Sequence, residues 1–89
     1  MKTERVTLRN RLGLHARAAS KLVNTAAGFR SNVWMVRDER RVNAKSIMGV
    51  LMLAAPVGTE LEVECDGPDE DDALAALVGL VSDRFGEDE

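Results

Sequence analysis

Hydrophobic and polar residues alternate along several short stretches of the chain, which is the pattern of strands with one buried face. The alternation is clearest over residues 60–65, where a leucine, a valine and a cysteine alternate with three glutamates. Residues 5–9 show the same alternation, and residues 33–36 predict a strand with Val33 and Met35 on one face and Trp34 and Val36 on the other. A polar pair, Asp38-Glu39, predicts a turn, and residues 41–44 predict the strand that returns from it. We therefore expect four strands.

Apolar residues three and four positions apart predict two longer helices. The first begins at Ala16 and ends at Gly28, a residue suited to the left-handed conformation that terminates many helices. The second runs from Asp69 to Phe85 and opens with acids that favour the positive end of the helix dipole. The expected buried positions are Ala16, Ala19, Leu22, Val23 and Ala26 in the first helix and Leu74, Leu77, Val78, Val81 and Phe85 in the second.

A third, shorter helix is predicted over residues 47–53, which are almost wholly apolar. Ser46 precedes this segment, and a serine hydroxyl at that position caps a helix by accepting from its free amides. So short a helix cannot bury all of its large side chains, so we expect part of them to be exposed. These side chains are Ile47, Met48, Leu51 and Met52. The last four residues, 86–89, are predicted to form a loose tail.

The order of elements is strand, helix, strand, strand, short helix, strand, helix, without a repeat or a linker. Strands with one polar face and helices with one apolar face predict a two-layer α+β domain, in which helices pack on one side of a mostly antiparallel sheet. At 89 residues the chain is expected to form a single domain, residues 1–89. A domain of this size has little room for a deep substrate pocket.

Charge is distributed unevenly along the chain. Residues 1–45 carry 11 Lys and Arg against 3 Asp and Glu, residues 46–89 carry 1 against 12, and the net charge is −3. A basic surface near the N-terminal elements would suit an acidic partner or a phosphate. The acidic total and the few aromatic residues argue against nucleic acid. Without an apolar run of membrane-spanning length, a secretory signal or a second cysteine, we expect no membrane insertion and a cytoplasmic protein.

The chain has one histidine, His15, directly before the first predicted helix. A helix N-terminus presents unpaired amides, here those of Ala16 and Arg17, which bind anions together with the helix dipole. A neutral imidazole is a nucleophile, and the Arg17 guanidinium can donate to phosphate oxygens. These residues predict a phosphoryl-accepting site, although a lone histidine there can also be a plain surface or capping residue. No glycine-rich nucleotide loop occurs, and we expect no metal site and no cofactor.

Two short sequences resemble the signatures of the HPr family, the histidine-containing phosphocarriers of the bacterial phosphotransferase system. Gly13-Leu-His-Ala-Arg17 is similar to that family's active-site motif, and Asn43-Ala-Lys-Ser-Ile-Met-Gly-Val50 is similar to the segment around its regulatory serine. The motifs lie at the family's separation, and the order of elements matches over almost the whole chain. One departure is Ala18, where the family usually has proline. Alanine is a strong helix former, so we expect the helix to form and the active-site loop to be less rigid.

The resemblance implies an open-faced sandwich, with a four-stranded antiparallel sheet covered on one face by three helices. It implies that His15 takes a phosphoryl group from enzyme I and passes it to a IIA domain, with Arg17 stabilising the phosphate, so the protein is a carrier and not an enzyme. It also implies phosphorylation of Ser46 by an HPr kinase/phosphorylase in bacteria that have one. We expect a monomer. The expected partner surface comprises Ser20, Lys21, Asn24, Ile47, Met48, Leu51 and Met52.

Two alternatives belong to other classes of function. The acidic end of the chain, residues 85–89, resembles the nitrogen-related branch, in which the phosphorylation state of the carrier is a signal. Lys45-Ser-Ile-Met-Gly49 is more similar to the sugar-transport type, so the branch stays open, as do the sugar and the IIA partner. An independent acid–base enzyme built on His15 would need a second catalytic base and a longer chain, and the sequence offers neither.

Overall fold

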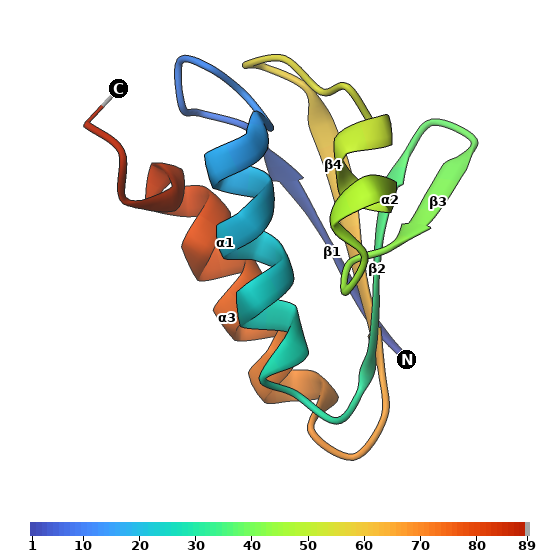
Figure 1. Cartoon of the computed structure of the whole chain (residues 1–89). Coiled ribbons are helices and arrows are strands. Elements are labelled where there is room, and N and C mark those ends of the chain that lie inside the picture. Colours follow the sequence, from blue (N-terminus) through green and yellow to red (C-terminus); the bar gives the residue numbers. More distant parts are fainter. Residues whose placement is uncertain (89) are drawn as a thin grey trace.

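A computed structural model describes residues 1–88, and within them one four-stranded sheet is covered by helices (Figure 1). The elements in chain order are β1 (Lys2–Thr7), α1 (Ala16–Ala27), β2 (Asn32–Arg37), β3 (Arg40–Asn43), α2 (Ile47–Met52), β4 (Glu60–Asp66), α3 (Glu70–Ser82) and a single 3₁₀ turn, η1 (Arg84–Gly86). No helix in this part of the chain is both long and apolar enough to cross a bilayer.

The sheet has the strand order β1-β4-β2-β3, and every neighbouring pair is antiparallel. The three α-helices lie on one face of the sheet, where α1 packs between α2 and α3, and α3 contacts β1 and β4 (Figure 1). The predicted open-faced α+β sandwich is therefore confirmed. β1 spans residues 2–7 instead of the predicted 5–9, because its pairing with β4 extends back to Lys2 opposite Cys65.

The central strand β4 carries the alternation that predicted it. Leu61, Val63 and Cys65 are buried beneath the helices, and Val63 lies opposite Met35 of β2 in the antiparallel register. Burial, with the nearby negative charges of α3's first turn, raises the pKa of the Cys65 thiol. A buried thiol with a raised pKa is a packing group and not a nucleophile at neutral pH.

Helix α1 differs from the prediction in the first turn of its buried face and in the residue that follows its last turn. Its buried residues include Ala18 and Ala19, so the first-turn residue that faces the sheet is Ala18, and Ala16 is exposed. Gly28 does not adopt the left-handed conformation, because its φ is −74° and the chain continues in a tight turn. The amides of Gly28 and Phe29 donate to the carbonyls of Thr25 and Ala26, each at 3.2 Å, and complete the end of the helix. Just beyond it, the Lys45 ammonium donates to the Phe29 carbonyl at 2.8 Å.

Helix α3 ends earlier than predicted. It stops at Ser82, and Phe85 lies in η1 with a φ of 55°, outside the helical stripe to which the periodicity assigned it. Phe85 is nonetheless fully buried and belongs to the core with Leu77 and Val81. The chain therefore changes direction after α3 and returns its last aromatic side chain to the core.

The face of the sheet away from the helices explains Trp34, which alternation predicts to lie opposite the core. The Arg41 guanidinium lies 3.9 Å from the centroid of the Trp34 ring, and its Nε donates to a Glu64 carboxylate oxygen at 2.8 Å. The three residues belong to adjacent strands β2, β3 and β4. An arginine between an aromatic face and a carboxylate thus ties the three strands together on this face.

Candidate functional site

His15 is the N-cap residue of α1 and has extended backbone dihedrals, with φ −80° and ψ 179°. The Ala19 amide donates to the His15 carbonyl at 2.8 Å, and this is the first backbone hydrogen bond of the helix. The amides of Ala16 and Arg17 precede it and have no acceptor within the helix. The histidine therefore stands where backbone donors and the helix dipole favour an anion.

Gly13 brings the loop before α1 against the loop that follows α2. Its φ is +65°, and a Cβ at this position would lie 2.5 Å from the carbonyl oxygen of Ala55. The Leu14 amide donates to that same carbonyl at 2.9 Å, and the Leu14 side chain is buried. Only glycine allows this approach, so Gly13 fixes the position from which His15 points outward.

The C-terminal segment lies against this loop, and the predicted loose tail is wrong. Phe85 anchors the segment in the core, and its carbonyl accepts from Lys21 Nζ at 2.6 Å. Glu87 then contacts His15, with 2.6 Å between a carboxylate oxygen and Nε2. The other Glu87 oxygen accepts from the Asn10 side-chain amide at 3.1 Å. The final residue of the predicted tail, Glu89, lies outside the described residues.

Sequence reasoning missed Glu87, although one signal pointed to it. Phe85 is one of three aromatic residues in the chain, and a large aromatic side chain next to the end of a small domain is expected to be buried. Burial of Phe85 restricts where the next residues can lie. Acids near a chain end are nevertheless usually solvated, so the pattern alone favoured a loose tail.

The charge state of Glu87 follows from its neighbours. Burial would raise the pKa of this carboxyl, but hydrogen bonds from His15 and Asn10 and the positive charges of His15 and Lys21 outweigh it, so the pKa is lowered. The Glu87 side chain is 14% exposed and that of His15 is 26% exposed. An ionised carboxylate is therefore paired with the imidazole at the edge of solvent.

A pocket of about 500 Å³ opens in front of the histidine and is lined by Arg11, Leu12, His15, Arg17 and Glu87. The Arg17 side chain is exposed and makes no hydrogen bond or ion pair with the other residues of 1–88, so its guanidinium is able to turn towards an anion in this pocket. His15 and Arg17, which the sequence predicted together, therefore line one site. A phosphoryl-sized anion in the pocket would lie beside the N-cap of α1 and within the surroundings of the Arg17 guanidinium.

The other predicted α1 residues lie on its outer face, since Ser20, Lys21 and Asn24 are all exposed. Ser46 is the N-cap of α2, and its hydroxyl accepts from the Gly49 amide at 3.2 Å, as predicted. Ala18 is fully buried in the first turn of α1, before the first amide that bonds inside the helix. The helix forms with alanine there, as expected, because no backbone hydrogen bond depends on the residue type.

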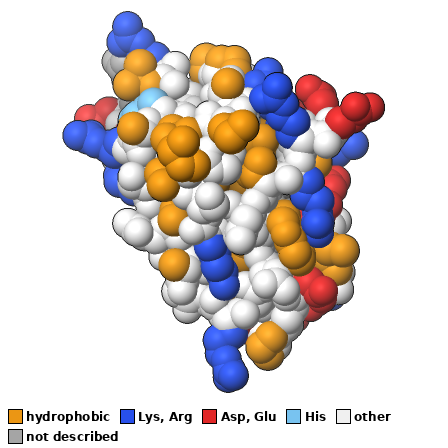
Figure 2. Space-filling model, turned by 45° about the vertical axis from the view of Figure 1, so that its right-hand side comes forward, with side chains coloured by type: hydrophobic (Ala, Val, Ile, Leu, Met, Phe, Trp, Pro, Cys, Tyr) orange, Lys and Arg blue, Asp and Glu red, His pale blue; other side chains and the backbone are white. Residues whose placement is uncertain are grey.

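Helix α2 exposes most of its large apolar side chains. Val50 is buried, whereas Met48 and Met52 are 67% and 65% exposed. Figure 2 shows hydrophobic side chains gathered on the same face as the single histidine, with lysine and arginine side chains around them. We call the exposed apolar residues Leu12, Ile47, Met48, Leu51 and Met52 the apolar patch.

Comparisons with known proteins agree with this geometry. The family model described as the PTS HPr component phosphorylation site matches residues 2–83. The phosphocarrier protein HPr of Cupriavidus necator is 55% identical over 83 residues, 93% of each chain, and that of Neisseria meningitidis serogroup A is 49% identical over 89 residues, 100% of each.

Solved structures give the same answer. HPr-C-His from Thermoanaerobacter tengcongensis is 42% identical, with a TM-score of 0.97 over 100% of both chains. The Bacillus subtilis protein Crh, whose structure is described as a swapped dimer, is 40% identical, with a TM-score of 0.76 over 94% of this chain and 97% of its own. The chain therefore belongs to the HPr family, the phosphocarrier proteins of the phosphotransferase system.

Proposed function

We propose that this chain accepts a phosphoryl group on His15 from phosphorylated enzyme I and transfers it to a IIA domain, acting as a cytoplasmic monomer. One observation carries the proposal: in a chain of this family, the only histidine opens a helix at the edge of a pocket that it shares with Arg17. Family membership supports the carrier role, and the site geometry supports these two residues.

The nitrogen that receives the phosphoryl group is Nδ1 in this proposal, because Nε2 faces the Glu87 carboxylate at 2.6 Å. The Nδ1 lone pair attacks phosphorus, a new N–P bond forms, and the donor's bond to phosphorus breaks with its electron pair left on the donor. The amides of Ala16 and Arg17 and the Arg17 guanidinium then balance the charge of the phosphoryl oxygens. Transfer to the acceptor reverses these steps.

Partners are proposed to bind the apolar patch and the outer face of α1, which carries Ser20, Lys21 and Asn24. Methionine side chains are flexible and polarisable, so one patch can adapt to more than one partner. Basic residues around the patch favour acidic partner surfaces. This combination suits a carrier that must bind a donor and an acceptor in turn with the same face.

The test is incubation of the protein with phosphoenolpyruvate and enzyme I, followed by intact-mass measurement. We expect one added phosphoryl group, labile in acid and stable in base, as for a phosphorylated imidazole. His15→Ala should lose the adduct and keep its fold, because the His15 side chain lies outside the core. Arg17→Ala should still form the adduct, but more slowly. An adduct of equal yield on His15→Ala would overturn the proposal.

Ser46 is a second proposed phosphorylation site, with a regulatory role. Its hydroxyl is partly exposed at the start of α2, next to the exposed methionines. A phosphate there would add negative charge beside the surface proposed to bind partners. Incubation with an HPr kinase/phosphorylase and ATP, with Ser46→Ala as the control, tests the modification. Transfer assays with IIA domains of the sugar-transport and nitrogen-related branches test which branch the carrier serves.

A further inference from the structure

We propose that Glu87 is a positioning residue for phosphoryl transfer, which holds the His15 imidazole with its proton on Nε2 and thereby keeps the Nδ1 lone pair available to phosphorus. This inference rests on the proposed function and assigns a role to a C-terminal residue beyond the matched residues 2–83. Its basis is the contact of 2.6 Å between the Glu87 carboxylate and His15 Nε2.

An ionised carboxylate has no proton to donate, so it can only accept hydrogen bonds. Nε2 must therefore carry a proton at this contact, whether the ring is neutral or charged. In a neutral ring the other nitrogen, Nδ1, is then unprotonated and has its lone pair free. The lowered pKa of Glu87 keeps the carboxylate ionised at neutral pH, which supports the same assignment.

Two anchors hold Glu87 in place. Phe85, two residues earlier, is buried in the core, and the Lys21 ammonium holds its carbonyl at 2.6 Å. On the other side, the Asn10 side-chain amide donates both to the Gly13 carbonyl at 2.6 Å and to Glu87 at 3.1 Å. The carboxylate is therefore tied to the loop that carries the histidine, and its orientation does not depend on His15 alone.

The same pair has a role after the phosphoryl group arrives. The new N–P bond uses the Nδ1 lone pair while Nε2 keeps its proton, so the ring becomes cationic and no proton has to leave. The Glu87 carboxylate lies beside Nε2, on the opposite side of the ring from Nδ1, and stabilises this positive charge. A carboxylate that orients an imidazole and stabilises its cation is the role of aspartate in serine-protease triads.

Replacement of Glu87 by glutamine gives a sharp expectation. The Asn10 side-chain NH₂ donates to residue 87, so in Glu87→Gln the glutamine oxygen should face Asn10. The glutamine NH₂ should then face His15. Nε2 would then have to accept, and the neutral ring would carry its proton on Nδ1. Glu87→Gln should therefore be worse for transfer than Glu87→Ala, which only removes the contact.

Nitrogen NMR of protein labelled with ¹⁵N in histidine tests the proton position without any partner. The wild-type protein should show a protonated Nε2 and an unprotonated Nδ1 at a pH where the ring is neutral. Glu87→Gln should shift the pattern towards a protonated Nδ1. Identical nitrogen shifts in the wild type and in Glu87→Gln would overturn the inference.

Kinetics of phosphoryl acceptance from enzyme I test the consequence. Glu87→Gln should lower the rate at saturating carrier by roughly 10- to 100-fold, with little change in the carrier concentration that gives half the maximal rate. Asp88→Asn is the matched control, since it removes the same charge from the next residue, which is exposed and whose backbone carbonyl makes its contact with Arg84. The control should retain the wild-type rate.

The outcomes separate this inference from the proposed function. If the wild type forms no adduct, or if His15→Ala forms one equally well, the proposed function fails. If the wild type forms the adduct on His15 while Glu87→Gln and Asp88→Asn have equal rates, the positioning role of Glu87 fails and the proposed function stands.

Discussion

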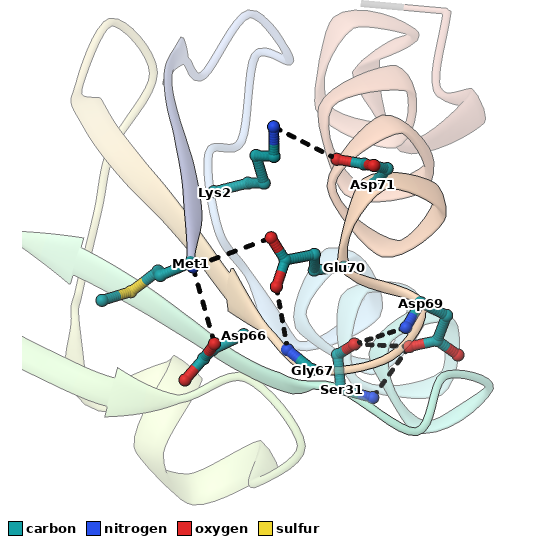
Figure 3. A network of polar contacts seen from close by, with 8 residues as sticks. All are labelled: Met1, Lys2, Ser31, Asp66, Gly67, Asp69, Glu70 and Asp71. Carbon is teal, nitrogen blue, oxygen red and sulfur yellow. Dashed lines mark hydrogen bonds and ion pairs between the residues drawn. The ribbon is translucent and has the colours of Figure 1, made fainter.

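Asp69, the N-cap of α3, joins two segments that are far apart in the sequence. Figure 1 shows the start of α3 at the opposite end of the molecule from the start of α1, where His15 is the N-cap. The Asp69 carboxylate accepts from the Arg30 amide at 2.9 Å. It also accepts from the Ser31 amide at 2.9 Å and from the Ser31 hydroxyl (Figure 3). Gly67 lets the chain approach Ser31, because a Cβ there would lie 2.6 Å from the Ser31 Cα at a φ of +154°. One aspartate therefore links the start of α3 to the start of β2.

These hydrogen bonds give the stability of the protein a defined dependence on acid. They lower the pKa of Asp69 from 3.8 to about 2, with the bond from the Ser31 hydroxyl as the largest cause. A carboxyl whose pKa is lower in the folded state stabilises the fold above its unfolded pKa and loses this contribution as pH falls through its folded value. The contribution of Asp69 is thus complete above about pH 4 and declines towards pH 2.

The free energy of unfolding should fall less between pH 4 and pH 2 in Asp69→Asn than in the wild type. Urea titration at each pH measures this quantity. Asp71→Asn is the matched control, because Asp71 lies on the same helix and makes only an exposed pair with Lys2 at 3.8 Å. It should retain the wild-type dependence. An equal change in both variants would assign the effect to charge in general and not to the Ser31 link.

At the scale of elements, α2 leaves most of its large apolar side chains exposed, as expected of the contact surface proposed for it. Its inward residue Val50 and the following Leu53 are fully buried, and the Arg37 and Arg40 guanidiniums hold its last carbonyls. The helix is thus held in place without burial of its outer side chains. The apolar patch is left available to a partner.

Met48→Ala should weaken binding to enzyme I by roughly fivefold or more, with little change in the free energy of unfolding, because this side chain is mostly exposed. Calorimetric titration and urea unfolding measure the two quantities. Val36→Ala, an apolar truncation on the strand face away from the helices, is the control and should leave affinity unchanged. Lost stability with unchanged affinity would make Met48 a structural residue.

Ser46→Asp should keep the fold and weaken the same binding. Aspartate is also a good N-cap, so the bond to the Gly49 amide can be retained. The added charge lies beside the apolar patch and disfavours an acidic partner. The same titration checks this, and an affinity equal to that of wild type would remove the electrostatic basis for regulation at Ser46.

At the scale of the whole molecule, the C-terminal segment couples the core to the site. Phe85 packs in the core and Glu87 contacts His15, although 72 positions separate the two residues of this pair. Figure 1 shows the segment beyond α3 at the same end of the molecule as the start of α1. The buried Phe85 side chain thus anchors the segment that brings Glu87 to His15.

Phe85→Ala should lower the free energy of unfolding by about 3 kcal/mol, the lower range for loss of a buried phenylalanine, since a segment near the chain end can partly relax. It should also slow phosphoryl acceptance, because the Glu87 contact depends on this anchor. Urea unfolding and the enzyme I assay measure both effects. Val57→Ala, at an exposed position, is the control and should change stability by less than about 0.5 kcal/mol. If Phe85→Ala had wild-type stability, Phe85 would not anchor the C-terminal segment, and the predicted loose tail would be correct after all.

The sequence alone determined the elements, their order and the two-layer architecture. Alternation over residues 60–65 and the spacing of Ala19, Leu22 and Ala26 are local patterns, and local patterns report directly which face of a strand or helix is buried. Local sequence also placed His15 and Ser46 at helix starts, where the structure has them as N-caps, and proposed them with Arg17 as site residues, since a helix N-terminus is a local feature and the two motifs are short.

Only the tertiary structure decided how the ends of elements are completed and which distant groups meet. Lys45 holds the turn after α1, where a left-handed residue was predicted at Gly28, and Arg41 explains the position of Trp34. The approach of Glu87 to His15 depends on Phe85 leaving the α3 register to enter the core. Periodicity records the neighbours of a residue along the chain, whereas these contacts depend on side chains from other elements, so no local pattern contains them.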